Sequence, residues 1–298
     1  MSSPEEQAFR LLTEYSNGFM VSQVLFAACE LGVFDLLAEA PEPLGAAAVA
    51  ARLGTSSHGT ELLLDTCVSL KLLQVETKTG KALYQNTELS STYLVRASPK
   101  CQGNMLRYLA RTTYLCWGHL TQAVRDGRNQ YLEAFGVPSD QLFSAIYRSE
   151  DERLLFMRGL QDVWSVSGRP VLGAFDLSPF PLICDVGGDF FKDPLPEADL
   201  YLLARVLHDW TDERCSRLLA RIHRACKPGG GVLVVESLLA ADGRGPLTAQ
   251  LYSLNMLVQT EGRERTPAQY RALLAAAGFR HVQCRRTGGL YDAILATR

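Results

Sequence analysis

The first hundred residues carry apolar positions at helical spacing. Pro4 followed by two glutamates is typical of a helix start, and Tyr15-Ser-Asn-Gly18 is expected to end that helix. Residues 19–31 are apolar nearly all round and predict a helix buried against another surface. The pattern predicts two further helices and then a hairpin around Gly80, at residues 46–53, 57–72 and 73–84. Helices followed by a hairpin form a winged-helix pattern.

The second half of the chain changes to alternating strands and helices. Residues 101–180 still read as helical, with one long helix over 148–166. After Pro181 the pattern predicts strands at 183–186, 200–203 and 232–236, and helices at 212–226, 247–259 and 267–277. The tail, 281–287 and 290–296, predicts a hairpin around Gly288-Gly289. This order indicates an α/β sheet with one antiparallel strand.

Charge argues against the DNA-binding role that winged helices often have. The 298-residue chain, long enough for about two domains, has a net charge of −2. Residues 1–100 hold 7 Lys and Arg against 11 Asp and Glu, whereas a DNA-binding domain needs a basic face. The apolar helix over 19–31 therefore favours a partner chain instead of nucleic acid.

The cysteines and the hydropathy indicate a reducing compartment. Eight cysteines form no CxxC pair, and most lie in apolar stretches, so buried free thiols are expected. No apolar run approaches the roughly 20 residues of a membrane span, and the N-terminus is polar and acidic. A cytoplasmic protein without a membrane partner is predicted.

Three titratable residues follow predicted strands. His208 lies just beyond the strand at 200–203, and Glu236 ends the next strand. Glu264 lies in the loop before the helix at Pro267. Ligands of open α/β sheets bind at this edge, where a histidine can take a proton and two carboxylates can orient it. Position alone equally allows a structural histidine that pairs with Asp209.

Other motifs have structural explanations. Lys227-Pro-Gly-Gly-Gly231 lacks the ending of a phosphate loop and follows a helix, so a helix-stop turn is expected. Trp164 and Met157 have the spacing of a core stripe. Asn255 and Gln259, four residues apart, share a helix face; they suit a small polar-aromatic ligand or a hydrated edge of the bundle.

Four motifs carry a family resemblance, namely Leu207-His-Asp-Trp210, Lys227-Pro-Gly-Gly-Gly231, Glu236-Ser-Leu-Leu239 and Arg263-Glu-Arg-Thr266. Together they resemble the small-molecule O-methyltransferases that use S-adenosylmethionine. Residues 18–37 and 253–262 are similar to vertebrate members that methylate the 5-hydroxyl of N-acetylserotonin, giving melatonin. The resemblance implies a winged-helix dimerisation domain over 1–105 and a Rossmann-like methyltransferase domain over 106–298. A homodimer is implied with it.

The resemblance also implies residue roles, with no metal. His208 would be the general base, flanked by Glu236 and Glu264. The hydroxyindole substrate would contact Asp209, Asn255 and Gln259. The cofactor S-adenosylmethionine would contact Tyr147, Trp164, Gly188, Asp189, Phe190 and Arg205.

The chain departs from the family at Gly188. There the family continues into a Gly-rich loop, a helix, and a strand ending in an acid that binds the ribose. This chain runs directly into Asp189, so a segment on the order of 40 residues is missing at 188/189. The strand at 182–187 is expected to become an exposed edge, joined to 199–203 without a helix. The alternative function is a catalytically inactive form that cannot bind the cofactor and pairs with the full-length enzyme.

Overall fold

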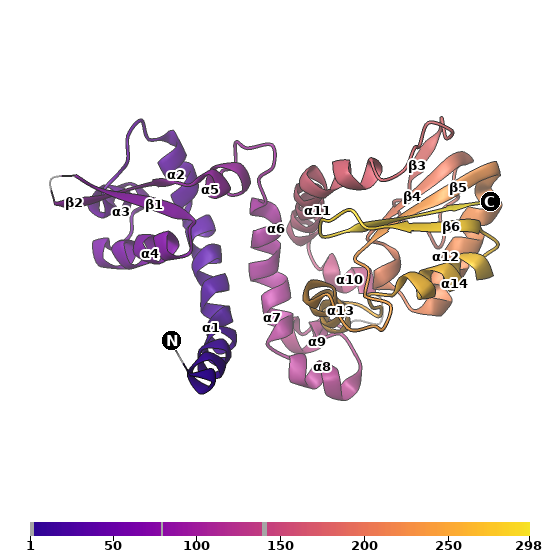
Figure 1. Cartoon of the computed structure of the whole chain (residues 1–298), viewed down its shortest axis with the longest axis horizontal. Helices are drawn as coiled ribbons and strands as arrows, with labels where there is room; N and C mark the ends of the chain where they lie inside the picture. Colours follow the sequence, from indigo (N-terminus) through magenta and orange to yellow (C-terminus); the bar gives the residue numbers. More distant parts are fainter. Residues whose placement is uncertain (1–2, 79, 139–141) are drawn as a thin grey trace. The chain divides into compact units, whose positions relative to one another are not determined.

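The computed structural model describes residues 3–78, 80–138 and 142–298 and divides into two compact units (Figure 1). One unit comprises the residues up to 112 together with 151–165. The other comprises 113–150 together with 166–298. Each unit is described by itself.

The N-terminal unit begins with a 28-residue helix, α1 (Pro4–Leu31). Ser3 and Glu6 form a capping box at its start, and Gly32 ends it in a left-handed conformation. The expected stop at Gly18 is wrong. A glycine inside a helix costs only about 1 kcal/mol relative to alanine, and the apolar residues on both sides keep the helix continuous.

Much of the apolar surface of α1 is exposed within one copy of the chain, so the burial of residues 19–31 against a partner chain stays a prediction. The exposed apolar positions include Phe9, Leu12, Tyr15 and Phe19. Their spacing of three or four residues puts them on one side of the helix. Among the described residues of one copy, none covers this side of the helix.

Three helices and a hairpin follow in the predicted winged-helix order. They are α2 (Val33–Glu39), α3 (Ala46–Leu53), α4 (Ser57–Ser69), β1 (Leu73–Lys78) and β2 (Lys81–Asn86). The two strands pair antiparallel, with Leu73 opposite Asn86. The core of this part includes Phe34, Leu64 and Tyr84. The unit continues with α5 (Glu88–Tyr93), α6 (Gly103–Tyr108) and the π-helical turn η1 (Leu109–Thr113).

Short helices lead from there to the sheet of the second unit. They are α7 (Tyr114–Trp117), α8 (Leu120–Asp126), α9 (Tyr131–Phe135) and α10 (Leu142–Ile146). The long helix α11 (Glu150–Leu172) contributes residues to both units. Met157 on α11 is 43% exposed, so the core role expected for it is wrong.

The second unit is built on a five-stranded sheet in the order β3-β4-β5-β7-β6 (Figure 1). Its strands are β3 (Ile183–Asp185), β4 (Ala198–Ala204), β5 (Cys226–Glu236), β6 (Arg280–Arg285) and β7 (Asp292–Thr297). Strands β3, β4 and β5 are parallel, and β7 is antiparallel to both of its neighbours. The single antiparallel strand and the terminal hairpin are therefore confirmed.

Three helices lie between or beside these strands: α12 (Asp212–Ala225), α13 (Leu247–Gln259) and α14 (Pro267–Ala276). Thr211 caps α12, whose buried face includes Leu218, Leu219 and Ile222. The helix-stop turn expected at Lys227–Gly231 is only half right. The helix ends at Ala225, but the glycines lie inside β5, as a bulge between the Ala198–Cys226 and Leu200–Gly231 pairs.

Strand β3 lies at the edge of the sheet, as predicted. It pairs parallel with β4, with Ile183 opposite Leu200. Residues 186–197, which join the two strands, contain a turn and no helix. Parallel neighbours are usually joined by a helix, so this connection is unusually short.

No described helix is by itself long and apolar enough to span a membrane; α1 and α2 reach that length and apolarity only when joined across a 51° bend.

All eight cysteines are free, and each is buried or half-buried, as predicted.

Candidate active site

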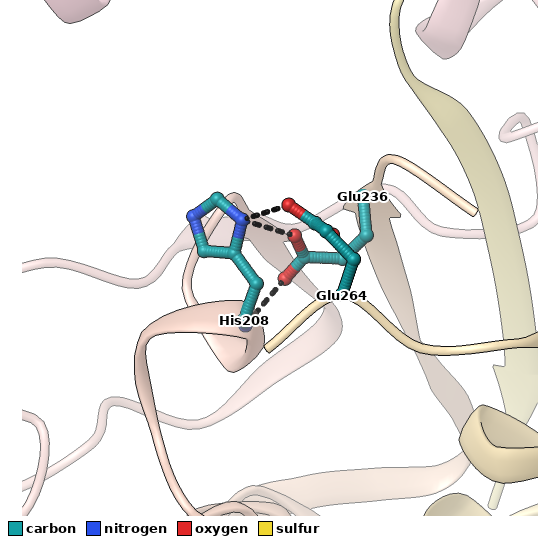
Figure 2. A group of neighbouring side chains, drawn as sticks. All are labelled: His208, Glu236 and Glu264. Atoms are coloured by element: carbon teal, nitrogen blue, oxygen red, sulfur yellow. Dashed lines mark hydrogen bonds and ion pairs between the residues drawn. The ribbon is translucent and has the colours of Figure 1, made fainter. Parts of the chain in front are cut away.

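His208 lies in the short 3₁₀ turn η2 (Leu207–Asp209), directly after β4. Glu236 is the last residue of β5, and Glu264 belongs to the loop before α14. Because β4 and β5 are parallel, their carboxyl ends meet at one edge of the sheet. The structure thus brings together the three residues that the sequence placed at this edge (Figure 2).

Both carboxylates face the same nitrogen of the imidazole ring (Figure 2). His208 Nδ1 lies 2.8 Å from Glu264 Oε1 and 3.4 Å from Glu236 Oε2. Glu236 Oε1 also accepts hydrogen bonds from the backbone N–H groups of Leu207 and His208, at 2.9 and 3.2 Å. The nitrogen Nε2 is on the far side of the ring, 3.7 Å from Asp209 Oδ1. The two glutamates therefore fix the ring through Nδ1, and Nε2 points away from both of them.

Burial and the neighbouring carboxylates shift the pKa of His208 in opposite directions. Burial alone would lower the pKa of His208, but Glu236, Glu264 and Asp209 raise it, to about 10. Burial raises the pKa of Glu236 to about 7; His208 opposes this rise and Glu264 adds to it. The three groups share protons as a unit, and the imidazole holds its proton tightly.

Arg265 fixes the turn that carries His208. Its guanidinium donates to the carbonyl oxygens of Leu207 and Trp210, at 2.9 and 2.7 Å, and to Asp212 Oδ1 at 2.8 Å. Gly262 packs against the same turn, where a Cβ atom would overlap the His208 carbonyl oxygen. Together the two residues hold the turn from the loop that also supplies Glu264.

Replacing Arg265 with methionine is expected to destabilise the chain by about 3–5 kcal/mol, because it leaves buried carbonyls without donors. Arg263→Met is the matched control. Arg263 also pairs with Asp212, at 2.9 Å, but it is 52% exposed where Arg265 is 1% exposed. We expect the control to cost less than about 1 kcal/mol. Urea unfolding measures both, and equal losses would contradict the positioning role of Arg265.

The same three residues could hold a divalent cation. One donor atom from each of His208, Glu236 and Glu264 lies within 4.8 Å of the others, the only such group among the described residues. Glu236 Oε2 and Glu264 Oε2 are buried without a hydrogen-bond partner. The sequence-based expectation of no metal therefore stays a prediction.

The predicted substrate amides are bonded to one another. Gln259 Nε2 donates to Asn255 Oδ1 at 2.6 Å, and Trp117 Nε1 donates to the same oxygen at 2.9 Å. Gln259 Oε1 accepts from Thr113 and Tyr131, at 3.4 and 3.5 Å. The pair is hydrogen-bonded to Trp117 of α7 and Tyr131 of α9, and its role toward a substrate stays a prediction.

Two residues predicted to bind the cofactor belong to an aromatic cluster around Trp210. Phe190 lies edge-on to Trp210, with ring centroids 6.3 Å apart. Tyr147 contacts Phe143 at 5.3 Å, and Phe143 contacts Trp210 at 5.5 Å. Phe191 packs edge-on to Trp210 at 4.9 Å. Trp210 Nε1 is buried without a hydrogen-bond partner.

Arg205 adopts a backbone conformation that is rare for an L-residue, with φ of 59°. Its guanidinium lies over the ring of Tyr291, 5.2 Å from the centroid, and Tyr291 stacks on Tyr252 at 6.4 Å. Burial would lower the pKa of Arg205, but Tyr291 and Asp209 raise it. A permanently charged group whose buried Nε has no hydrogen-bond partner is therefore held near Asp209 and Tyr291.

The remaining residues predicted to bind the cofactor make none of the contacts with Trp210 or Arg205 described above. Gly188 has φ of 72°, and a Cβ there would lie 3.0 Å from Asp193 Oδ2. Asp189 pairs with Lys192 at 3.1 Å and accepts from the backbone of Phe191. Trp164 belongs to the other compact unit. Their roles toward a cofactor stay predictions.

Two known protein families together match most of the chain. The family described as O-methyltransferase dimerisation domain matches residues 13–96. The family described as O-methyltransferase domain matches residues 117–189 and 186–280. The chain belongs to the O-methyltransferase family.

Individual relatives of this O-methyltransferase share its whole length. Acetylserotonin O-methyltransferases of Bos taurus and Homo sapiens are 63% and 62% identical to it, and each alignment covers 100% of both chains. The crystal structure of human N-acetylserotonin methyltransferase in complex with SAM superposes with a TM-score of 0.97 and 62% identity, covering 100% of this chain and 99% of that one.

A more distant structure supports the fold alone. The mitomycin 7-O-methyltransferase MmcR superposes with a TM-score of 0.82 at 23% identity, covering 99% of this O-methyltransferase and 98% of that chain.

The comparisons also locate an interruption. The alignments with the bovine and human relatives run over 345 positions, whereas this O-methyltransferase has 298 residues, so at least 47 positions have no counterpart in it. The family match is in two pieces that overlap at residues 186–189. This is the place where the sequence predicts a missing segment.

Sequence reasoning missed several residues of this site. Arg265 and Trp210 lie in the motifs that carry the family resemblance, so proximity to His208 and Glu264 was the available signal. Gly262 precedes one of these motifs. Phe143 and Trp117 lie in helical stretches whose aromatic residues have nothing to distinguish them from core positions.

Proposed function

We propose that this chain transfers a methyl group from S-adenosylmethionine to the 5-hydroxyl of N-acetylserotonin, giving melatonin. The buried His208–Glu264 pair at the carboxyl edge of the sheet is the observation that carries the chemistry. Relatives 62–63% identical over their full length support the choice of donor and acceptor.

The residues of the chain supply a base, its alignment and exclusion of water. Bound S-adenosylmethionine supplies a methyl group on a sulfonium, which is already a good electrophile. The acceptor hydroxyl would give its proton to His208 Nε2, because Nδ1 is engaged by Glu264. A phenolic hydroxyl has a pKa of about 10, close to that of His208. The raised pKa of His208 thus favours proton transfer from the hydroxyl to the imidazole.

Part of the chain fits the cofactor. Trp210 Nε1 and Arg205 Nε are buried donors without partners, suited to a heterocycle beside the aromatic cluster and to a carboxylate. Among the described residues of the loop after β3, Asp189 and Asp193 are engaged in local bonds, with Lys192 and with the backbone N–H of Asp189. The family resemblance assigns the ribose to an acid in the missing segment, so this chain has no counterpart of that acid.

The raised pKa of His208 leads to a prediction on pH. Because the neighbouring carboxylates raise the pKa of His208 above neutral pH, most molecules carry the protonated imidazole at pH 7 and few carry the neutral base. We expect kcat/KM to rise close to tenfold per pH unit from pH 7 to 9. In Glu264→Gln, loss of a neighbouring carboxylate lowers the pKa of His208, so the profile levels off at lower pH. A profile independent of pH in both proteins would contradict the base role.

The choice of acceptor can be tested with a matched pair of compounds. N-acetyltryptamine lacks the 5-hydroxyl of N-acetylserotonin and is otherwise identical. Mass spectrometry at saturating S-adenosylmethionine should detect a methylated product from N-acetylserotonin alone. Equal methylation of both compounds would place the reaction at another atom and reject the proposal.

A second candidate is a catalytically inactive chain that pairs with the full-length enzyme. The interruption of the family match at residues 186–189 favours it, while the full-length relatives favour the enzyme. Methyl transfer to N-acetylserotonin at millimolar S-adenosylmethionine separates them, because the inactive chain would form no product.

We further propose a cytoplasmic homodimer without nucleic-acid or membrane partners, divided into domains at 1–105 and 106–298. The match to a dimerisation domain at 13–96 and the exposed apolar side of α1 support the dimer. The acidic balance of residues 1–100 argues against DNA.

The dimer leads to a prediction on α1. Leu12→Glu places a charge on the exposed apolar side and is expected to weaken dimerisation at least tenfold. Arg10→Glu, on the opposite side of the helix, is the control and should leave the dimer intact. Sedimentation velocity measures both, and a dimer equally stable in both variants would show that α1 does not form the interface.

A further inference from the structure

Strand β3 presents an unprotected edge. Leu182 and Ile183 are 50% and 46% exposed, and no strand of the described chain pairs with β3 on the side opposite β4. Natural edge strands usually carry a lysine, a proline or a bulge that prevents pairing with another chain. Residues 182–186, Leu-Ile-Cys-Asp-Val, contain none of the three and a single charge.

The backbone of β3 alternates between its two sides. Leu182 O accepts from the N–H groups of Asp199 and Leu200, and Val186 N–H donates to Leu202 O, at 2.9, 3.1 and 3.1 Å. Residues 182 and 186 therefore point their backbone groups at β4, and by alternation Cys184 does too. The N–H and C=O groups of Ile183 and Asp185 point to the open side.

We propose that this edge pairs with β3 of a second copy of the chain, antiparallel and centred on Cys184. In this register Ile183 of each copy lies opposite Asp185 of the other, and the two residues exchange both backbone hydrogen bonds. The twofold axis that relates the two copies generates a second, identical pair, in which Asp185 of the first copy lies opposite Ile183 of the other. Four outward backbone groups of each copy are satisfied in this way.

Neighbouring registers are less favourable. A pair centred on Ile183 would place Asp185 opposite Pro181, which has no N–H to donate. A pair centred on Asp185 would put two carboxylates directly opposite each other. The register centred on Cys184 avoids both, because each Asp185 faces an isoleucine.

The second copy is the occupant that the chain itself indicates. At least 47 alignment positions of the relatives are absent here, and the family match breaks at residues 186–189, immediately after β3. The open edge is thus particular to this shortened chain, and only another copy brings the same open edge. The chain also has a separate dimerisation domain, so pairing at β3 joins dimers into larger assemblies.

Cys184 provides a direct test. A residue opposite its own copy in a non-hydrogen-bonded pair has a Cα–Cα distance of about 4.5 Å, within the range for a disulfide. Diamide, which accepts two electrons and two protons from a thiol pair, is expected to convert the chain into a covalently linked pair on non-reducing gels. Cys184→Ser should abolish this product. Cys284→Ser should keep it, since Cys284 is a half-buried cysteine on β6, at the other edge of the sheet. A linked pair that persists in Cys184→Ser would overturn the proposal.

Sedimentation supplies a test without oxidation. The intact chain at tens of micromolar should form species larger than a dimer, and Ile183→Val should as well. Ile183→Pro removes only a backbone N–H that points to the open side of β3. This variant should form dimers but no larger species, and its circular dichroism spectrum should be unchanged. If the proline variant does not fold, Ile183→Lys adds a charge to the edge and should give the same loss of assembly. An intact chain that stays a dimer, or assemblies that survive these variants, would overturn β3 pairing.

Discussion

Restoring the missing segment between Gly188 and Asp189 is expected to raise the affinity for S-adenosylmethionine by roughly 10²–10⁴-fold. In the restored protein, the segment of the bovine relative that is missing from this chain is inserted between Gly188 and Asp189. The present chain is expected to need a far higher cofactor concentration for the same occupancy.

The reason lies in the contacts that the family resemblance assigns to that segment. A carboxylate that binds a ribose diol makes charge-assisted hydrogen bonds, each worth about 1.5–3 kcal/mol. The Gly-rich turn and the helix N-terminus that follow it are absent as well, and with them the close approach of backbone to cofactor. At 1.4 kcal/mol per factor of ten, loss of two such bonds gives the stated range.

Isothermal titration calorimetry with S-adenosylmethionine and S-adenosylhomocysteine measures this difference. A Gly/Ser insert of the same length is the matched control. It restores the length of the β3–β4 connection without the binding side chains, and it should leave affinity low. Micromolar affinity in the chain as it stands would contradict the prediction and show that residues 188–205 rebuild the site by another route.

His208→Ala is expected to lower turnover of N-acetylserotonin by roughly 10²–10⁴-fold, the usual worth of a general base. The substitution removes the only nitrogen that the cluster leaves facing away from Glu236 and Glu264. Turnover should be measured at saturating cofactor, in the restored protein as well as in this chain, so that cofactor affinity does not enter.

His58→Ala is the control for that experiment, because His58 is an exposed residue of the first turn of α4. It should leave turnover unchanged. The unfolding midpoint of His208→Ala must be compared too, since the loss of a buried, hydrogen-bonded ring also affects stability. A folded His208→Ala protein with unchanged turnover at neutral pH would make His208 a structural residue.

The edge of the sheet where the site lies could be predicted from the sequence, because strand ends have local signals. His208 and Glu236 each follow a short apolar run, and parallel strands bring such ends together. The open position of β3 could also be predicted, since twelve residues without a helix pattern cannot supply the usual connection.

Other features depend on contacts between distant segments and have no local signal. Arg265 is fully buried because it finds carbonyls of residues 207 and 210, more than fifty positions earlier. Asn255 and Gln259 are hydrogen-bonded to Trp117 and Tyr131, which only the folded chain brings near them. Local propensity also misplaced the end of α1, because the cost of Gly18 is small against a helix of 28 residues.

Methyl transfer to N-acetylserotonin at millimolar S-adenosylmethionine, followed by mass spectrometry in this chain and in the restored protein, tests the central claim most directly. We expect a 5-methoxy product in both, formed faster in the restored protein and suppressed in both by His208→Ala. Absence of this product in the restored protein, with cofactor demonstrably bound, would contradict it.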